Sequence, residues 1–378
     1  MNQVYDVIVV GGGVIGMTCA LRLAQTGRSV LVIEKARCGD EASSAAAGML
    51  GAQLEVAEPG DFYQLCLESR KLYQAFADEL YEVTGIDAQL THNGILQLAY
   101  TEDEVEALMG RLRWQTNHGE HAQWLTPTEV SEREAALAPS LGGLLLPDDG
   151  NIHAPLLMRA LAAAVNQRCT VLEGTEVVQI DRDVQGNYAI ITPSASFHTE
   201  TVVVANGAFA SRLLAHFGVS FTVQPVKGQL LAIRPRHGQS IRHTLFSRHS
   251  YLVPKRDGSV VVGATEDHAS GFNYDVTSDA IMTLLQAAGR IAPGLDDAVF
   301  ERSWVGLRPL ASDERPWIGE LPEFPNLHLA VGHFRNGILL APVTGSMIVQ
   351  SVEQQAWLDH WQSFRAQRAV SKKEVPAG

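Results

Sequence analysis

A glycine-rich turn between an apolar strand and a helix constrains the start of this chain more than any other feature. The β-branched run Val7 to Val10 is followed by Gly11, Gly13 and Gly16 in the spacing G-x-G-x-x-G. In a βαβ unit the first of these glycines permits the tight turn, the second admits a pyrophosphate to the backbone, and the third lets the helix pack against the strand. The pattern predicts a parallel βαβ unit that binds a dinucleotide, in preference to the same unit without a ligand.

An acidic residue stands where such a unit contacts the ribose of its ligand. The predicted helix begins at Val14, and a second strand over residues 29–33 leads directly into Glu34. Glu34 follows Gly11 by 23 residues. A carboxylate at this spacing, at the tip of the second strand, accepts hydrogen bonds from an adenosine ribose. We therefore expect Glu34 to contact the ligand.

Two later segments are rich in small residues and could lie against the same ligand. The first, "EASSAAAGMLGAQLE" over residues 41–55, would let a long cofactor follow the backbone, although a flexible loop without a ligand explains it equally well. The second is a predicted strand over residues 198–210, which passes through Ala205, Asn206 and Gly207. These residues indicate a close backbone approach to the cofactor or an ordinary hairpin turn.

Strands and helices are distributed unevenly along the rest of the chain. Strands cluster over residues 225–233 and 250–267, with a hairpin at Asp257-Gly258, instead of alternating with helices. This pattern predicts a second domain with a mixed or antiparallel sheet beside the dinucleotide-binding domain. The fold class is therefore α/β, or α+β overall: a Rossmann-like domain and a second sheet domain, interleaved in sequence. We expect helices over 62–84, 102–114, 156–165 and 279–294, and further strands within 94–100, 169–183 and 188–194.

Acidic residues outnumber basic ones, and no dense Lys/Arg stripe occurs. The 378 residues include 42 Asp and Glu against 29 Lys and Arg. This balance argues against nucleic acid or an anionic membrane as the main partner and favours a small molecule. The four cysteines form no CxxC pair, no HExxH motif occurs, and the N-terminus is unlike a signal peptide. We expect a cytoplasmic protein with no metal and no membrane span.

Two arginines near the C-terminus stand in glycine-bordered segments. Arg308 precedes a proline in "WVGLRPLASDERPWIGELP", which we interpret as a turn, and Arg335 lies in "GHFRNGILLAP". A guanidinium group binds a planar carboxylate through two parallel hydrogen bonds and keeps its charge when partly buried. The arginines therefore indicate an anion site or, equally, structural ion pairs, with Asp313 and Glu314 as partners for Arg308.

A predicted apolar helix follows Arg335 and begins at a glycine. Its N-terminal N–H groups and dipole would point back toward the turn, where they would stabilise negative charge on a reduced isoalloxazine ring. Tyr251 begins a strand in the second domain. Its ring could belong to the core, which the sequence alone favours, or could present its hydroxyl to a ligand carboxylate.

Taken together, these motifs resemble the D-amino-acid oxidase superfamily of flavoproteins, and within it the glycine oxidase family. The resemblance covers residues 5–365. It is carried by "VIVVGGGVIG", "SSAAAGMLGA", "VVVANGAFA", "PVKGQ", "YLVPKRDGSVVVGAT", "WVGLRPLASDERPWIG" and "GHFRNGILLAP". The last two stretches are more specific than a glycine fingerprint.

The resemblance implies a non-covalent FAD, bound in extended form with its flavin ring between the two domains. It implies oxidative deamination of glycine, sarcosine or small D-amino acids, by hydride transfer from Cα of the neutral amine to flavin N5. Dioxygen would then reoxidise the flavin and give hydrogen peroxide. The resemblance further implies a role in forming the thiazole of thiamine, and a homo-oligomer, specifically a tetramer.

The resemblance also implies roles for individual residues. Arg308 would pair with the substrate carboxylate, Tyr251 would hydrogen-bond to it, and Arg335 would lie in the same pocket. FAD would be contacted by Gly11, Gly13, Val14, Ile15, Gly16, Glu34, Lys35, Ala42, Ser43, Ser44, Ala47, Gly48, Met49, Val177, Ala205, Asn206, Gly207, His333, Phe334, Arg335, Asn336, Gly337, Ile338 and Leu339. The expected FAD-binding domain comprises 1–86, 143–224 and 303–365, the substrate-binding domain 87–142 and 225–302, and the tail 366–378 is expected to be disordered.

The sequence is compatible with alternatives to an oxidase. A dehydrogenase that uses an acceptor other than oxygen would have the same pocket, and a non-catalytic flavin-binding interaction protein is a candidate of another class. Covalent flavin attachment near the C-terminal motif is disfavoured, because the last cysteine is Cys169. One departure from the family pattern is Glu266, which stands after "GAT" in place of a methionine. A carboxylate at the pocket wall could attract an amino group or narrow the site.

Overall fold

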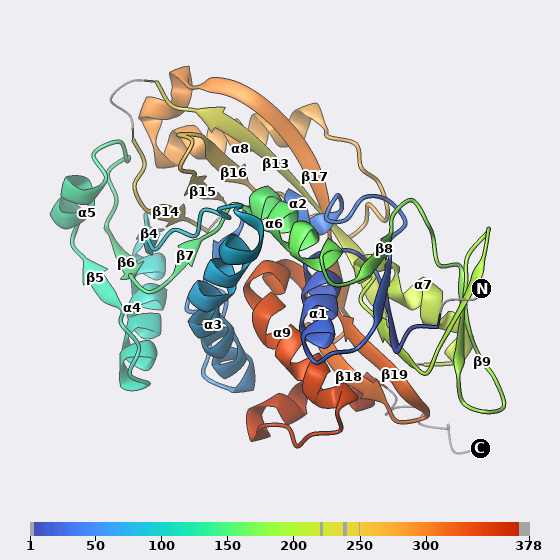
Figure 1. Cartoon of the computed structure of the whole chain (residues 1–378). Helices are drawn as coiled ribbons and strands as arrows, with labels where there is room; N and C mark the ends of the chain where they lie inside the picture. Colours follow the sequence, from blue (N-terminus) through green and yellow to red (C-terminus); the bar gives the residue numbers. More distant parts are fainter. Residues whose placement is uncertain (1–3, 220–221, 237–239, 249, 370–378) are drawn as a thin grey trace, which may run out of the picture.

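Two large sheets organise the chain in the computed structural model, which describes residues 4–219, 222–236, 240–248 and 250–369 (Figure 1). The first sheet has six strands in the order β18-β19-β12-β1-β2-β8. All neighbours are parallel except β18 and β19, which form an antiparallel pair. The strands are β1 (Val7–Val10), β2 (Val30–Ile33), β8 (Thr170–Leu172), β12 (Thr201–Val204), β18 (Trp317–Leu321) and β19 (Phe324–Val331).

The second sheet has eight strands in the order β17-β13-β16-β15-β14-β4-β6-β5. It is mixed, because β14 and β4 run parallel while its other neighbours run antiparallel. The α/β fold class expected from the sequence is therefore confirmed. The strands are β4 (Ile95–Ala99), β5 (Gln123–Leu125), β6 (Gly142–Leu146), β13 (Val223–Arg234), β14 (Thr244–Phe246), β15 (Tyr251–Pro254), β16 (Val260–Gly263) and β17 (Val299–Ala311).

Smaller elements complete the architecture. One small sheet joins β9 (Gln179–Arg182), β10 (Tyr188–Ile191) and β11 (Ser196–Thr199), and another joins β3 (Met49–Leu50) to β7 (Gly150–Asn151). The α-helices in the described residues are α1 (Val14–Gln25), α2 (Ala42–Ala45), α3 (Asp61–Thr84), α4 (Glu102–Asn117), α5 (Pro127–Arg133), α6 (Ala154–Asn166), α7 (Ala210–Leu214), α8 (Ser278–Ile291) and α9 (Gly337–Val352). The 3-10 turns are η1 (Gly207–Phe209), η2 (Ala215–Phe217), η3 (Pro293–Asp297), η4 (Phe334–Asn336), η5 (Asp359–Phe364) and η6 (Ala366–Ala369).

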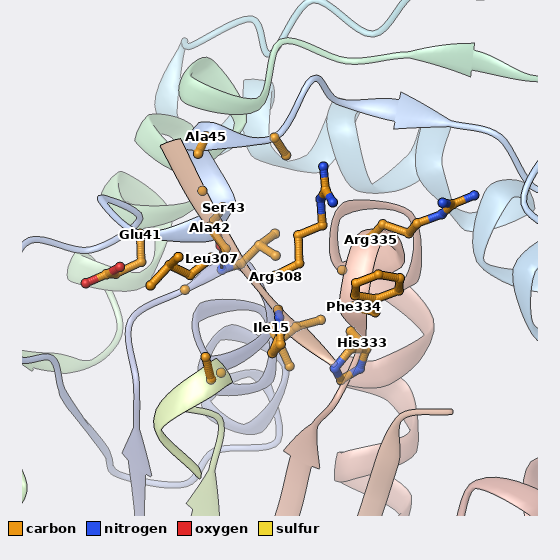
Figure 2. Close-up of a pocket in the computed structure, with 18 of the residues that line it drawn as sticks. Ile15, Glu41, Ala42, Ser43, Ala45, Leu307, Arg308, His333, Phe334 and Arg335 are labelled. Carbon is orange, nitrogen blue, oxygen red and sulfur yellow. Dashed lines mark hydrogen bonds between the residues drawn. The ribbon is translucent and has the colours of Figure 1, made fainter. Parts of the chain in front are cut away.

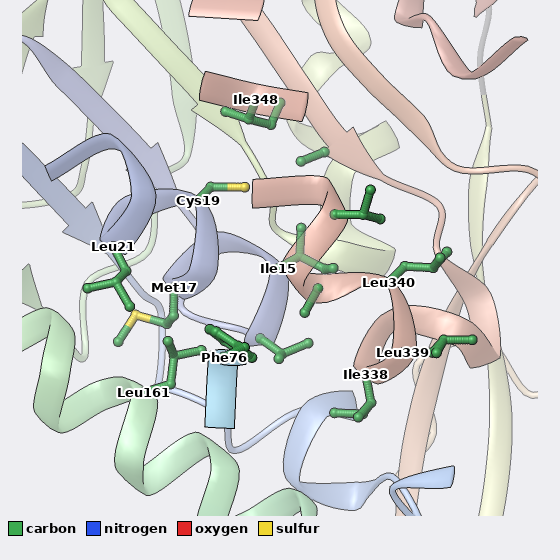
Figure 3. Close-up of a cluster of buried hydrophobic side chains, with 14 of the residues drawn as sticks. Ile15, Met17, Cys19, Leu21, Phe76, Leu161, Ile338, Leu339, Leu340 and Ile348 are labelled. Atoms are coloured by element: carbon green, nitrogen blue, oxygen red, sulfur yellow. The ribbon is translucent and has the colours of Figure 1, made fainter. Parts of the chain in front are cut away.

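Helix α1 is the centre of the main hydrophobic core. It packs against α9 and α6, which α3 also contacts (Figure 1), and its side chains are buried almost all round the helix. Figure 3 shows Met17 and Leu21 of α1 with Leu161 of α6, and Ile338 and Leu340 at the start of α9 in the same cluster. The packing of α1 against α9 fixes the β1–α1 turn relative to the turn that precedes α9. These two turns both border the large cavity of the protein.

Two local predictions were wrong. The strand expected over residues 198–210 is two strands in different sheets, because Thr199 Oγ1 accepts a hydrogen bond from the Thr201 N–H (3.2 Å) and the chain changes direction there. Arg308 lies not in a turn but in β17, opposite Val226 of β13. Strand β17 is at the edge of its sheet, where Pro309 is tolerated because an edge strand leaves one side of its backbone unpaired.

Two of the expected domain boundaries fall inside strands of the structure. Residue 143 falls in β6 and residue 303 in β17, and both strands belong to the eight-stranded sheet. We retain the interleaved two-domain division as a proposal. Of the tail 366–378, residues 366–369 form η6, and the remainder lies outside the described residues. None of the described helices is both long enough and apolar enough to cross a membrane.

Candidate functional site

A cavity of about 500 Å³ is lined by residues of both large sheets. At one end its wall is formed by the β1–α1 turn and the segment over residues 41–49. At the other end the wall is formed by β17, the start of β15 and the turn before α9. Figure 2 shows Arg308 between the Glu41–Ala45 side and Arg335. The cavity begins at the carboxyl ends of parallel strands, where open α/β sheets bind their ligands.

The glycines of the first turn fit the role expected of them. Gly11 has φ +112°, and a Cβ on it would overlap the backbone of Ala205, which follows β12. A Cβ on Gly16 would overlap the carbonyl of Gly11, so α1 can start close to β1 only with glycine here. Gly13 and Val14 line the cavity. The first turn of α1 therefore faces the cavity, and a helix N-terminus favours bound phosphate.

Two polar side chains near the β1–α1 turn are placed to contact a ligand. Glu34 follows β2 and is 7% exposed. Its carboxylate accepts hydrogen bonds from the N–H of Gly12 (2.7 Å) and of Ala36 (2.9 Å), which fix it at the cavity wall with lone pairs to spare. Asn206 also lines the cavity, and its buried Oδ1 has no hydrogen-bond partner among the described residues. A buried acceptor of this kind needs a donor, which a bound ligand would supply.

The segment before β3 follows the cavity from the first turn toward the arginines. Ser43 Oγ accepts a hydrogen bond from the N–H of Val14 (2.9 Å), so α2 is fixed to the first turn of α1. Lys255 Nζ donates to the carbonyl of Ala47 (2.7 Å) and to that of Ile152 (3.0 Å), and this fixes the other end of the segment. Together these contacts hold a groove of small side chains, which fits an extended dinucleotide such as FAD.

Most of the residues expected to contact the cofactor line this cavity, and four do not. Gly16 packs against Gly11 behind the wall, Ser44 faces two smaller cavities, and Leu339 is buried in the core. Asn336 is buried at the start of α9. The cavity is lined by Gly11, Gly13, Val14, Ile15, Glu34, Lys35, Ala42, Ser43, Ala47, Gly48, Met49, Val177, Ala205, Asn206, Gly207, Tyr251, Arg308, His333, Phe334, Arg335, Gly337 and Ile338.

Arg308 reaches the other end of the cavity from β17 and is 17% exposed. Its Nη2 donates to the carbonyl of Thr265 (3.0 Å), while its buried Nη1 has no hydrogen-bond partner in the part of the chain that the structure describes. Gly228 on β13 makes room for it, since a Cβ there would overlap the guanidinium group. The alternative pairing of Arg308 with Asp313 does not form, and Asp313 instead pairs with Arg368 (2.7 Å).

Arg335 comes from η4 and is paired with a carboxylate that the sequence did not single out. Its Nε lies 2.6 Å from Oε2 of Glu55, a side chain only 7% exposed. The charge of Glu55 raises the pKa of Arg335, so the guanidinium stays protonated. A single acid in a loop carries no signal of this role, and Glu55 and Arg335 are 280 residues apart. Phe209, Phe246 and Arg248 are other lining residues that sequence reasoning missed.

Tyr251 and His333 complete the wall near the arginines. A Cβ on Gly263 would overlap the ring of Tyr251, so glycine is needed where the ring packs. Burial raises the pKa of Tyr251, although the charge of Arg308 acts in the opposite direction. The phenol is therefore protonated and can donate a hydrogen bond. Burial lowers the pKa of His333 to about 3, so this histidine is neutral, and positive potential here comes from the N-terminus of α9 and the arginines.

The chain is similar in sequence and in structure to known proteins. Residues 6–351 match the DAO family, described as FAD dependent oxidoreductase. Glycine oxidase of Geobacillus kaustophilus is 39% identical over 99% of this chain and 100% of its own length. The crystal structure of glycine oxidase from Geobacillus kaustophilus has a TM-score of 0.93 at 40% identity, over 96% of this chain and 98% of that one. The bifunctional protein ThiO/ThiG of Synechocystis is 35% identical over 100% of this chain and 56% of its own length.

Proposed function

This chain belongs to the DAO family of FAD-dependent oxidoreductases, and from that premise we propose that it oxidises glycine and other small amino acids, such as sarcosine and small D-amino acids. One observation carries the proposal. Nη1 of Arg308 is buried without a hydrogen-bond partner among the described residues, and Arg308 lines the same cavity as the dinucleotide turn at Gly11. A small anionic substrate beside the flavin would supply the hydrogen-bond acceptor that Nη1 lacks, since the nearest carboxylate, Glu266, lies 3.6 Å away. The similarity to glycine oxidases supports an amino acid as that substrate.

We propose that one end of the cavity holds the dinucleotide half of FAD, and that the other end holds the flavin and the amino-acid substrate. The β1–α1 turn and Glu34 hold the adenosine and pyrophosphate of FAD, and the turn before α9 lies beside the flavin. Arg308 binds the substrate carboxylate, and Tyr251 donates a hydrogen bond to it. Fixing the carboxylate orients the Cα–H bond of the substrate. The reaction then becomes effectively unimolecular, which lowers its entropic barrier.

Bound FAD would supply the redox chemistry, in which the hydride of Cα goes to N5 and the electrons pass to dioxygen to give hydrogen peroxide. The chain itself contributes position and charge. The N-terminus of α9, which begins at Gly337, lies at the cavity and stabilises negative charge there. His333 stays neutral at working pH and hydrogen-bonds to Thr344 (3.0 Å), so it keeps a fixed orientation.

The similarity to the bifunctional protein ThiO/ThiG supports a biological role. We propose that the imine formed from glycine feeds the thiazole branch of thiamine biosynthesis. We also propose a cytoplasmic location, which rests on composition and cysteine usage, and a homo-oligomer, which rests on the family. Dioxygen is the proposed electron acceptor.

An anaerobic titration of the holoenzyme with glycine, sarcosine and D-alanine tests the function. We expect the visible flavin absorbance to bleach with at least one of them and to recover when air enters, with release of hydrogen peroxide. Bleaching that air does not reverse, but a quinone does, would indicate a dehydrogenase. A flavin that none of the three amines bleaches would refute the proposed substrate class.

A further inference from the structure

Glu266 occupies a position between the two arginines of the cavity. It follows β16 and is 41% exposed. Its Oε2 lies 3.6 Å from Nη1 of Arg308 and 3.9 Å from Nη1 of Arg335, while its Oε1 lies 3.0 Å from Nε2 of His268. The carboxylate is therefore close to both cations without a close hydrogen bond to either of them.

A pocket with two arginines would by itself attract a substrate with two carboxylates. The carboxylates of Glu55 and Glu266 change this balance. Glu55 is paired closely with Arg335, at 2.6 Å from its Nε. A second substrate carboxylate that paired with Nη1 of Arg335 would come within a few ångströms of Glu266, because Glu266 itself lies 3.9 Å from that atom. Two carboxylates at that distance repel each other.

We propose that Glu266 is a charge-selecting residue of the substrate pocket, which accepts amino acids with one carboxylate and rejects those with a second anionic group near the amine. The α-carboxylate still has Nη1 of Arg308, which lies 3.6 Å from Glu266, so every substrate accepts one such repulsion and a second carboxylate would add another. A substrate with a second cationic group gains from the same carboxylate. This inference rests on the proposed function and narrows its substrate class to monocarboxylic amino acids with a neutral or basic substituent.

Binding of unreactive ligands to the holoenzyme tests the inference apart from turnover. Methoxyacetate and diglycolate are ether analogues of sarcosine and iminodiacetate, and they differ by one carboxylate. Each Kd is measured from the perturbation of the flavin absorbance. In the protein as it stands we expect diglycolate to bind more weakly than methoxyacetate. Glu266→Gln keeps the shape of the side chain. In this variant the Kd of diglycolate divided by the Kd of methoxyacetate should fall by about tenfold.

Two controls separate charge from size and from general effects. Glu106→Gln removes a carboxylate from the exposed face of α4, and the Kd ratio should not change. 2-Aminoethoxyacetate and propoxyacetate, again ethers in place of the reactive amine, differ by a cationic group at similar length. Glu266→Gln should weaken binding of the cationic ligand relative to the neutral one, whereas in the anionic pair it should strengthen binding of diglycolate relative to methoxyacetate. If Glu266 only narrowed the pocket, Glu266→Gln would leave both ratios unchanged, because the two side chains have the same shape.

Kinetics of flavin reduction by sarcosine and iminodiacetate complete the test. If Glu266→Gln raises kcat/KM for iminodiacetate relative to sarcosine, and the binding ratios shift as above, the inference holds. If sarcosine reduces the flavin but neither ratio changes in the variant, charge selection by Glu266 is wrong and the proposed function stands. If no amine reduces the flavin and the ligand ratios also stay unchanged, both proposals fail. Ratios that shift without any reduction support charge selection and refute only the proposed oxidation.

Discussion

Arg308→Ala removes the guanidinium group that we expect to hold the substrate carboxylate. The group would make two charge-assisted hydrogen bonds to the carboxylate, each contributing about 1.5–3 kcal/mol. Pairing with the partly exposed Glu266 in the free enzyme offsets about 1 kcal/mol of this, since the two charges are 3.6 Å apart and partly solvated. A net loss of about 3 kcal/mol corresponds to roughly a 150-fold increase in the Kd of the substrate.

The assay is an anaerobic titration of flavin absorbance with glycine, together with the flavin content of the purified variant. We expect FAD to remain bound, because the contacts of its dinucleotide half are made by the β1–α1 turn and Glu34. Arg302→Ala is the matched control: Arg302 lies in the same strand, β17, but is exposed and does not line the large cavity. An Arg308→Ala protein that keeps its FAD and binds glycine as tightly as the control would refute the assignment of the carboxylate to Arg308.

Three further perturbations test the supporting structure. Lys255→Met removes the hydrogen bonds to the carbonyls of Ala47 and Ile152, so the Kd of FAD, measured by flavin fluorescence, should rise by about tenfold or more, whereas the exposed Lys71→Met should leave it unchanged. Gly11→Ala should lower FAD occupancy and Tm more than Gly27→Ala, because both glycines have positive φ but only Gly11 would place a Cβ against backbone atoms. Burial lowers the pKa of His328 to about 4, below its unfolded value near 6.5, so its stabilising contribution is present above pH ~6.5 and is lost as pH falls toward 4. The free energy of unfolding, measured with denaturant, should fall by about 2 kcal/mol between pH 7 and 5 from this residue alone, and His328→Gln should lose correspondingly less.

Much of the fold could be predicted from the sequence because its signals are local. The glycine spacing after Val7–Val10 specifies a strand, a turn and a helix, and the structure has β1 and α1 at these positions. Clustered strands indicated the mixed second sheet in the same way. The misplacement of Arg308 also has a local cause: apart from Pro309, which the edge strand tolerates, the turn-forming residues begin only after Ala311, where β17 ends.

The candidate site was predicted only in part. The motifs singled out Arg308, Arg335 and most of the cofactor segment as residue types suited to anions and dinucleotides. They did not indicate Glu55, whose contact with Arg335 joins positions 280 residues apart. They also did not indicate that Lys255 holds Ala47 in place across 208 residues.

Sequence by itself determined which segments form strands and helices, and which of them carry glycines and arginines, because steric and hydrogen-bonding preferences act over a few residues. Only the tertiary structure decided the charge balance of the pocket. Thr265 and Glu266 became the neighbours of Arg308, and Asp313 did not. The choice of ion-pair partner depends on which strands lie side by side and on how far water is excluded between them, and neither is encoded in the residues next to a charge.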